Sequence, residues 1–193
     1  YTTREFLGLL GEEAGRNSGG EQGVLSSAAR RGVPVYCPAI GDSSIGIGLA
    51  EKERRVVFDV IGDVEETAAL ALKKPSMVIY VGGGTPKNFI QQTEVTNIVN
   101  GRMLSGHKYA IQFVVDAPNW GGLSGCTFEE AVSWGKIAVD ARMVSVLCDA
   151  TIALPVAATA VLTRRQGKKR PGKHISAVSY THPEPTRLRR ISY

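Results

Sequence analysis

The 193-residue sequence has few of the residues that cross-link small secreted folds. Its three cysteines, Cys37, Cys126 and Cys148, are far apart, odd in number and never arranged as Cys-x-x-Cys. This pattern favours reduced thiols in a cytoplasmic protein over a disulfide framework. The three histidines have no ligand-like spacing with the cysteines, so we expect no metal site.

Long apolar runs are also missing. No stretch of about 18 apolar residues occurs, which argues against a transmembrane helix and a membrane partner. No charged-then-apolar signal opens the chain. The first residues, YTTREFLGLLGEEAG, begin without Met and have the pattern of a helix already under way. We therefore expect an N-terminally truncated cytoplasmic protein.

Basic charge is concentrated at one end of the sequence. Residues 163–193 carry nine lysines and arginines against one acid, whereas residues 1–162 carry 14 against 17. A basic tail can bind nucleic acid. This tail has no interleaved aromatic residues and no known binding module around it, so we do not expect a nucleic-acid partner. We treat residues 163–193 as a disordered or non-native tail and residues 1–162 as the domain.

Apolar runs rich in β-formers alternate with helical patterns along residues 1–162. Strands are expected at 33–40, 54–63, 76–84, 108–117 and from residue 143, and helices at 3–14, 23–31, 64–74, 85–101, 127–139 and beyond residue 149. Fully apolar strands that alternate with helices are typical of a parallel sheet covered on both faces. The expected fold is therefore α/β, Rossmann-like and doubly wound, with a mainly parallel sheet and helices on both faces.

Glycine-rich or acidic turns follow four of the expected strands. They are GDSSIG, GGGTPKN, DAPNWGGLSG and CDAT. Ligands of doubly wound folds bind at the carboxyl ends of the strands. We therefore expect these four turns to converge on one crevice.

The turn GGGTPKN contains Gly82, Gly83 and Gly84 between an expected strand and an expected helix. Glycines let backbone N–H groups approach a phosphate, and a helix N-terminus favours an anion. A tight strand-to-helix turn would explain two of the glycines without any ligand. The motif thus leaves phosphate or dinucleotide binding and a purely structural turn both open.

Acidic and aromatic side chains accompany these turns. Asp42, Asp116 and Asp149 each follow an expected strand. They could cap helices, or they could hold ribose hydroxyls or amines in a crevice. Trp120 and Trp134 could be core residues or a wall for a cationic ligand, because ammonium groups bind indole faces.

Lys136 lies in EEAVSWGKIAVDA, within the helix expected at 127–139. Thr127 and Glu130 have capping-box spacing at the start of that helix. A lysine desolvated among the apolar residues that follow would have a lowered pKa and could form a Schiff base. An exposed lysine on the solvent side is the plainer interpretation, and periodicity alone favours it.

Three segments together resemble one known family. PAIGDSSIG, GGGTPKN and EEAVSWGKI, in this order, resemble deoxyhypusine synthase, and the resemblance covers about residues 1–162. It corresponds to the C-terminal half of that family's chain. It implies a homotetramer with sites at a dimer interface, and transfer of an aminobutyl group from spermidine or a related polyamine.

The resemblance also implies the course of the reaction. NAD oxidises spermidine, an enzyme lysine attacks the imine, and diaminopropane leaves. The aminobutyl group then passes to an acceptor amine, which in the family is a lysine of a translation initiation factor, and NADH reduces the product.

The resemblance assigns roles to individual residues. Lys136 corresponds to the covalent nucleophile, and Trp134 and Glu130 correspond to the polyamine-site tryptophan and acid. The positions that match cofactor contacts are Asp42, Gly82, Gly83, Gly84 and Asp149.

Three positions depart from the eukaryotic enzymes. Ile47 replaces a second acid, Asn88 replaces a substrate-side histidine, and Leu123 falls near an amine-binding acid. These departures resemble the bacterial deoxyhypusine synthase-like branch and imply another acceptor or donor. Homospermidine formation, with putrescine as acceptor, is one alternative. A non-catalytic NAD- or polyamine-binding protein is another, although the retained Lys136 argues against it.

Overall fold

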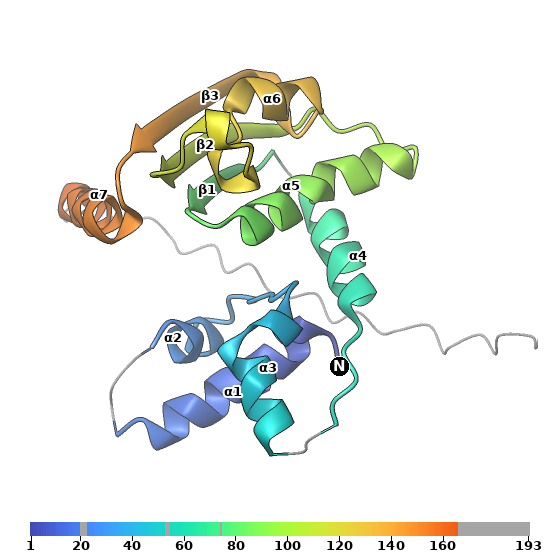
Figure 1. Ribbon diagram of the computed structural model, residues 1–193, viewed down its shortest axis with the longest axis vertical. Coiled ribbons are helices and arrows are strands. Elements are labelled where there is room, and N and C mark those ends of the chain that lie inside the picture. Colours follow the sequence, from blue (N-terminus) through green and yellow to red (C-terminus); the bar gives the residue numbers. More distant parts are fainter. Residues whose placement is uncertain (20–22, 53–54, 74, 166–193) are drawn as a thin grey trace, which may run out of the picture.

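The computed structural model describes residues 1–19, 23–52, 55–73 and 75–165 (Figure 1). The elements of the N-terminal part are α1 (Thr3–Asn17), α2 (Val24–Arg30), η1 (Ile40–Asp42), α3 (Ser44–Glu51) and α4 (Val60–Ala71). Figure 1 shows α4 running from this group of helices toward the sheet. The expected tail lies outside the described residues, except that residues 163–165 continue the last helix.

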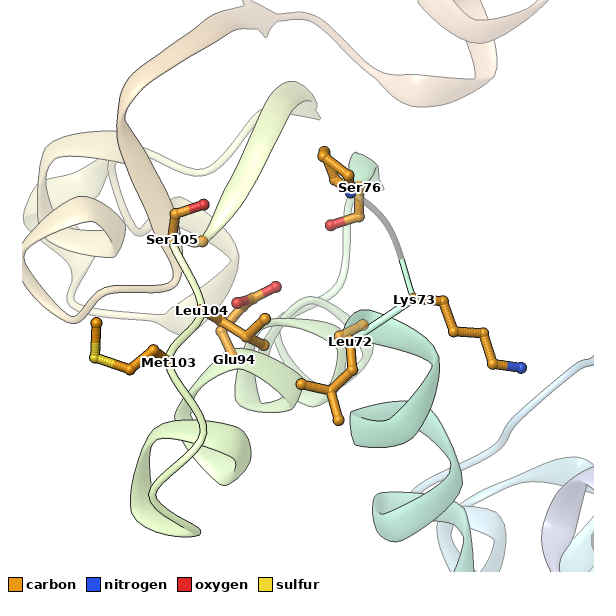
Figure 2. Close-up of a pocket in the computed structure, with 10 residues that line it drawn as sticks. Leu72, Lys73, Ser76, Glu94, Met103, Leu104 and Ser105 are labelled. Carbon is orange, nitrogen blue, oxygen red and sulfur yellow. The ribbon is translucent and has the colours of Figure 1, made fainter.

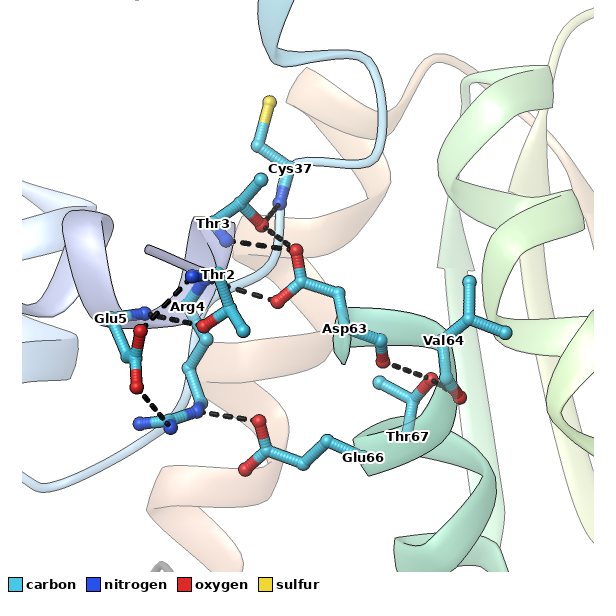
Figure 3. Close-up of polar contacts among 9 residues, drawn as sticks. All are labelled: Thr2, Thr3, Arg4, Glu5, Cys37, Asp63, Val64, Glu66 and Thr67. Carbon is cyan, nitrogen blue, oxygen red and sulfur yellow. Dashed lines mark hydrogen bonds and ion pairs between the residues drawn. The ribbon is translucent and has the colours of Figure 1, made fainter. Parts of the chain in front are cut away.

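A buried carboxylate joins α1 to α4 (Figure 3). Asp63, 1% exposed, accepts hydrogen bonds from the backbone N–H of Thr3 at 2.9 Å, from the Thr3 hydroxyl at 2.6 Å and from the backbone N–H of Arg4 at 3.2 Å. The Arg4 guanidinium donates to Glu66 at 2.6 Å. The first N–H groups of a helix have no intrahelical acceptor, so Asp63 caps α1 from a distant part of the sequence.

The sheet is parallel, with strand order β1-β2-β3. Its strands are β1 (Met77–Val81), β2 (His107–Val114) and β3 (Ile137–Leu147). The helices and turns between and after them are α5 (Gly84–Val99), η2 (Pro118–Trp120), η3 (Leu123–Gly125), α6 (Phe128–Ser133) and α7 (Ala150–Arg165). The expected α/β, Rossmann-like fold with a parallel sheet is confirmed. Within the described residues, no helix is both long and apolar enough to cross a bilayer.

The core lies between α5, α6 and one face of the sheet. It comprises Val78, Tyr80, Ala110, Phe128, Ala131 and Ile137, with Ile90 of α5 packed against them. Alternate side chains of β1 point to the opposite face, where Met77 and Ile79 are 52% and 53% exposed. Tyr109 and Val144 are also at least half exposed. The described part of the chain therefore leaves one sheet face largely open.

Two of the expected strands do not form. Residues 33–37 form no strand, because Pro34 and Pro38 cannot donate to a ladder. Residues 55–59 form no strand either, although the Val57 carbonyl and the Asp59 N–H form hydrogen bonds with the backbone of Tyr1, and α4 begins earlier than expected, at Val60. Asp59 caps this helix by accepting from the backbone N–H of Gly62 at 2.8 Å. The apolar residues before Asp59 predict a strand, but Asp59 caps a helix and so ends that segment.

Candidate functional site

The helix expected at 127–139 ends early, and Lys136 is not inside it. Gly135 adopts φ +70°, in the left-handed region. Its N–H donates to the Val132 carbonyl at 2.9 Å, and the N–H of Lys136 donates to the Ala131 carbonyl at 3.0 Å. This pair of bonds is a Schellman motif, which terminates α6 at a glycine. Lys136 therefore lies in a hydrogen-bonded turn directly before β3.

The side chain of Lys136 lies beside Trp134. Its ammonium nitrogen is 5.9 Å from the centre of the indole ring, within range of a cation–π interaction. Trp134 is 64% exposed, so most of its surface is open to a ligand. Lys136 is half-buried. Its exposure is therefore intermediate between the desolvated amine and the solvent-exposed lysine that the sequence leaves open.

A second lysine, which the sequence interpretation missed, lies near the first. Lys87, in the first turn of α5, is 3% exposed and its ammonium nitrogen is 5.5 Å from the centre of the Tyr80 ring. It donates to the Cys126 and Ser124 carbonyls at 2.7 and 3.3 Å. Its place in GGGTPK, directly after the glycines, is the signal that could have identified it.

Charges connect Lys87 to the turn that carries Lys136. Burial lowers the pKa of Lys87; Cys126 and Glu130 oppose this shift, and the positive charge of Lys136 adds to it. Burial and a hydrogen bond to Glu130 raise the pKa of the Cys126 thiol. The structure thus brings Lys136, Trp134 and Glu130 together, and it adds Lys87 and Cys126 to the group.

Glu130 also helps to begin α6. Its backbone N–H donates to the Thr127 hydroxyl at 3.2 Å, which is the N-cap bond that the spacing predicts. Its exposed side chain remains available at the surface near Cys126.

The three glycines form the turn between β1 and α5. Gly82 and Gly83 have φ +60° and +66°, which a residue with a side chain rarely adopts. A Cβ added to Gly84 would lie 3.1 Å from Cβ of Leu123. The turn therefore favours glycine at all three positions for structural reasons. Gly82 and Gly83 have positive φ, and the loop that contains Leu123 approaches Gly84 closely. Gly83, the N-cap of α5, offers no side-chain acceptor, so the first N–H groups of the helix are not capped by it.

Two aspartates stand with these glycines at the carboxyl edge of the sheet. Asp116 follows β2 and accepts from the Ser124 hydroxyl, which anchors the loop between β2 and α6. Asp149 follows β3 and accepts from the N–H of Thr151 at 2.8 Å and from its hydroxyl at 2.6 Å. These bonds to Thr151 lower the pKa of Asp149.

Asp42 does not join this edge. It lies in η1 of the N-terminal helical part, because the strand expected before it does not form. Of the four expected strand ends, the described structure contains three. Trp120, at the end of η2, is 69% exposed, and Asn88 is half-buried in the first turns of α5.

The glycine turn, Asp149 and Lys136 are divided between two opposite edges of the sheet. The glycine turn and Asp149 lie at the carboxyl edge, whereas Lys136 precedes β3 and its carbonyl accepts from the N–H of His107 at 3.2 Å. The paired length of β2, His107–Val114, separates the two edges by roughly 25 Å. The side chains of Lys136 and Lys87 interact along the face between these edges.

Comparisons with known proteins agree on one family. The family model for deoxyhypusine synthase matches residues 1–161. Probable deoxyhypusine synthase 2 of Methanosarcina acetivorans is 52% identical over 173 residues, which cover 88% of this chain and 50% of the relative. The protein of the same name from Archaeoglobus fulgidus is 52% identical over 169 residues, covering 86% and 56%.

A bacterial relative also matches. The deoxyhypusine synthase-like protein of Nostoc punctiforme is 41% identical over 188 residues, covering 90% of this chain and 48% of the relative. The chain thus spans about half the length of these relatives. With its family model matched over residues 1–161, the chain belongs to the deoxyhypusine synthase family.

Proposed function

We propose that this protein takes part in NAD-dependent transfer of an aminobutyl group from spermidine to an acceptor amine, with Lys136 as the covalent nucleophile. The observation that carries the proposal is the turn at Gly135. It holds a half-buried lysine beside an exposed indole, in a member of a transferase family.

In this proposal each residue of the Lys136 group has its own role. The Lys136 amine attacks the imine carbon of the oxidised polyamine, and a new bond from Nζ to the four-carbon fragment replaces the bond to the leaving diaminopropane. The exposed face of Trp134 binds an ammonium group of the substrate. The Glu130 carboxylate adds a negative charge beside it. Lys87 positions the loop by holding the Ser124 and Cys126 carbonyls.

The carboxyl edge fits an NAD phosphate and ribose. Nothing lies within 4 Å of the position that a Cβ on Gly82 would take, so an anion could approach the backbone there. Asp149 would offer a carboxylate oxygen to a hydroxyl. When bound, NAD would accept the hydride from the polyamine and return it to the product. Asp42 lies in the N-terminal helical part, so any contact that it makes with NAD would come from there and not from the carboxyl edge of the sheet.

The distance between the two edges supports a site shared between subunits, as in the homotetramer that the family resemblance implies. A cofactor at the carboxyl edge would lie roughly 25 Å from the backbone of Lys136 in the same chain. A site that takes its lysine from one subunit and its cofactor from another would remove this separation. The family resemblance implies sites at a dimer interface, where two subunits can supply the lysine and the cofactor contacts in this way.

The acceptor amine is a second part of the proposal. Leu123, 50% exposed, stands near the position of an amine-binding acid, and Ile47 and Asn88 also lack the charge or ring of the eukaryotic residues. These substitutions favour putrescine as acceptor, with homospermidine as product, over a protein lysine. A protein that binds NAD or polyamine without turnover is the non-catalytic alternative.

The test uses the 193-residue chain and any longer product of its gene. Each is incubated with NAD and spermidine, with and without putrescine, and the amines are measured by mass spectrometry. Homospermidine formed only with putrescine would support the small-molecule acceptor. Diaminopropane release alone would indicate a protein acceptor. Binding of NAD or spermidine without any turnover would favour the non-catalytic alternative.

A further inference from the structure

A cavity of about 450 Å³ opens at the amino edge of the sheet (Figure 2). It lies between the end of α4, the middle of α5 and the segment before β2. Leu72 and Leu104 form apolar walls, Met103 lies at the rim and is 99% exposed, and Ser76 and Ser105 add hydroxyl groups. None of its lining residues belongs to the Lys136 group or to the glycine turn.

The acidic group of this cavity is Glu94 on α5. The residue is 2% exposed, and Oε2 of its carboxyl makes no hydrogen bond with a described residue. Figure 2 shows the carboxyl between the walls of the cavity, facing the gap between Ser76 and Ser105. Buried carboxyl oxygens are nearly always hydrogen-bonded, so an unpartnered one beside a cavity indicates a missing partner.

The basic group beside Glu94 is a histidine that already has another partner. His107 Nδ1 lies 3.6 Å from Oε1 of Glu94 and 2.6 Å from the Ser76 hydroxyl. Lys73 lines the cavity, but its side chain extends away from Glu94 in Figure 2. The Arg102 guanidinium donates to Asn97. Among the residues that the structure describes, no lysine or arginine pairs with Glu94.

We propose that this cavity binds an organic ammonium group, with the charged head on the Glu94 carboxylate, its alkyl stem along Leu72 and Leu104, and Met103 at the rim. A cationic head is proposed because Oε2 of the carboxyl makes no hydrogen bond and no lysine or arginine among the described residues pairs with it. An alkyl stem is proposed because Leu72 and Leu104 provide apolar surface beside the carboxyl. This site goes beyond the proposed transfer reaction and does not depend on it.

Proton exchange should accompany binding. Burial raises the pKa of Glu94, against a smaller effect of the Gly106 backbone, and burial lowers the pKa of His107. Both groups therefore favour their neutral forms. An ammonium head favours the ionised carboxylate, so its binding should lower the pKa of Glu94 again.

The experiment follows methyl resonances of the protein during titration with butylammonium chloride. The chain has three methionines, and Met103 alone lines the cavity. Met77 lies on the open sheet face and Met143 packs against the core, so both serve as internal controls. Titration with 1-butanol supplies a matched stem without the charge. So small a ligand is expected to bind with a Kd of about 1 mM.

Three variants complete the test. Glu94→Gln keeps the shape but removes the charge, and it should weaken binding by about tenfold or more. Glu51→Gln changes an exposed glutamate and should bind like the wild type. Ser105→Trp fills the cavity while retaining Glu94, and it should also lose binding, which keeps the test decisive if Glu94→Gln fails to fold.

A saturable Met103 shift that needs both the ammonium group and Glu94 would support the site. Absence of the shift, an equal shift with butanol, or an unchanged shift in folded Glu94→Gln would overturn it. Lys136→Ala should leave the Met103 response intact, so failure of the transfer reaction would be distinguishable from failure of this site.

Discussion

The ammonium nitrogen of Lys136 lies 5.9 Å from the centre of the Trp134 ring, although only Gly135 separates the two residues along the chain. In a continuous helix, residues two apart point in different directions. The left-handed conformation of Gly135 reverses the backbone and brings the two side chains to the same region. The cation–aromatic pair is therefore a product of the helix ending.

Gly135→Ala should disturb this turn. An alanine at φ +70° costs about 1–2 kcal/mol, and its Cβ would lie 3.2 Å from Ile98. We expect the free energy of unfolding to fall by about that amount in chemical denaturation. Gly8→Ala is the control: Gly8 is inside α1 with open space around it, so alanine should raise the stability by about 0.5–1 kcal/mol. Equal effects of the two changes would contradict the assignment.

Lys136→Ala and Lys136→Arg should both abolish covalent chemistry. After incubation with NAD and spermidine, borohydride reduction should leave an aminobutyl adduct on the wild type, because reduction converts an imine into a stable amine. Intact-mass and peptide mass spectrometry would locate the adduct. The arginine variant retains the charge beside Trp134, so it separates loss of the nucleophile from loss of the cation. An adduct on either variant would remove Lys136 from the mechanism.

Asp63→Asn should strongly destabilise the junction of α1 and α4. The buried carboxylate accepts three hydrogen bonds, and an amide nitrogen would confront the N–H donors of Thr3 and Arg4. We expect the free energy of unfolding to fall by about 2–4 kcal/mol. Asp59→Asn is the matched control, since asparagine is an equally good N-cap for α4 and should cost little. Similar losses for both variants would mean that burial of Asp63 is unimportant.

The pH dependence of stability should reveal Glu94. Its pKa is raised by burial, so the folded protein binds its proton more tightly than the unfolded chain does. The contribution of Glu94 to stability is therefore present below pH 4.5 and is lost as the pH rises through the raised folded pKa. Glu94→Gln should gain stability relative to the wild type over this range in denaturation curves.

His107 affects the pH dependence of stability in the opposite direction to Glu94. Burial lowers its pKa, so its destabilising effect grows as the pH falls from 6.5 through the lowered folded value. The comparison with Glu94→Gln isolates the carboxyl because both proteins retain His107. A difference in stability that is constant with pH would show that Glu94 does not titrate differently on folding.

Much of the α/β order follows from sequence patterns. The apolar runs at β1 and β2 and the proline at the start of α5 predict their elements correctly. The error at 127–139 has a local cause. Ile137 and Val139 are consistent with a helical period as well as with a strand, and the conformation of one glycine decides between them.

The candidate site was less accessible to sequence reasoning. The Lys136 motif predicts a nucleophile, but sequence spacing cannot show that Lys87 is buried against Tyr80 or that Oε2 of Glu94 lacks a hydrogen bond. Those properties depend on residues brought together from separate elements. The position expected for Asp42 was wrong because the apolar run before it was given more weight than Pro34 and Pro38, which keep that segment out of the sheet.

The open face of the sheet has a thermodynamic consequence. Met77, Ile79, Val81, Tyr109 and Val144 are each between 45% and 57% exposed, and they form a flat apolar wall across three strands. Water at such a wall has a high heat capacity, which is lost when apolar groups cover it. Any association that uses this face should therefore show a negative heat-capacity change in calorimetry, and its enthalpy should become more favourable as the temperature rises.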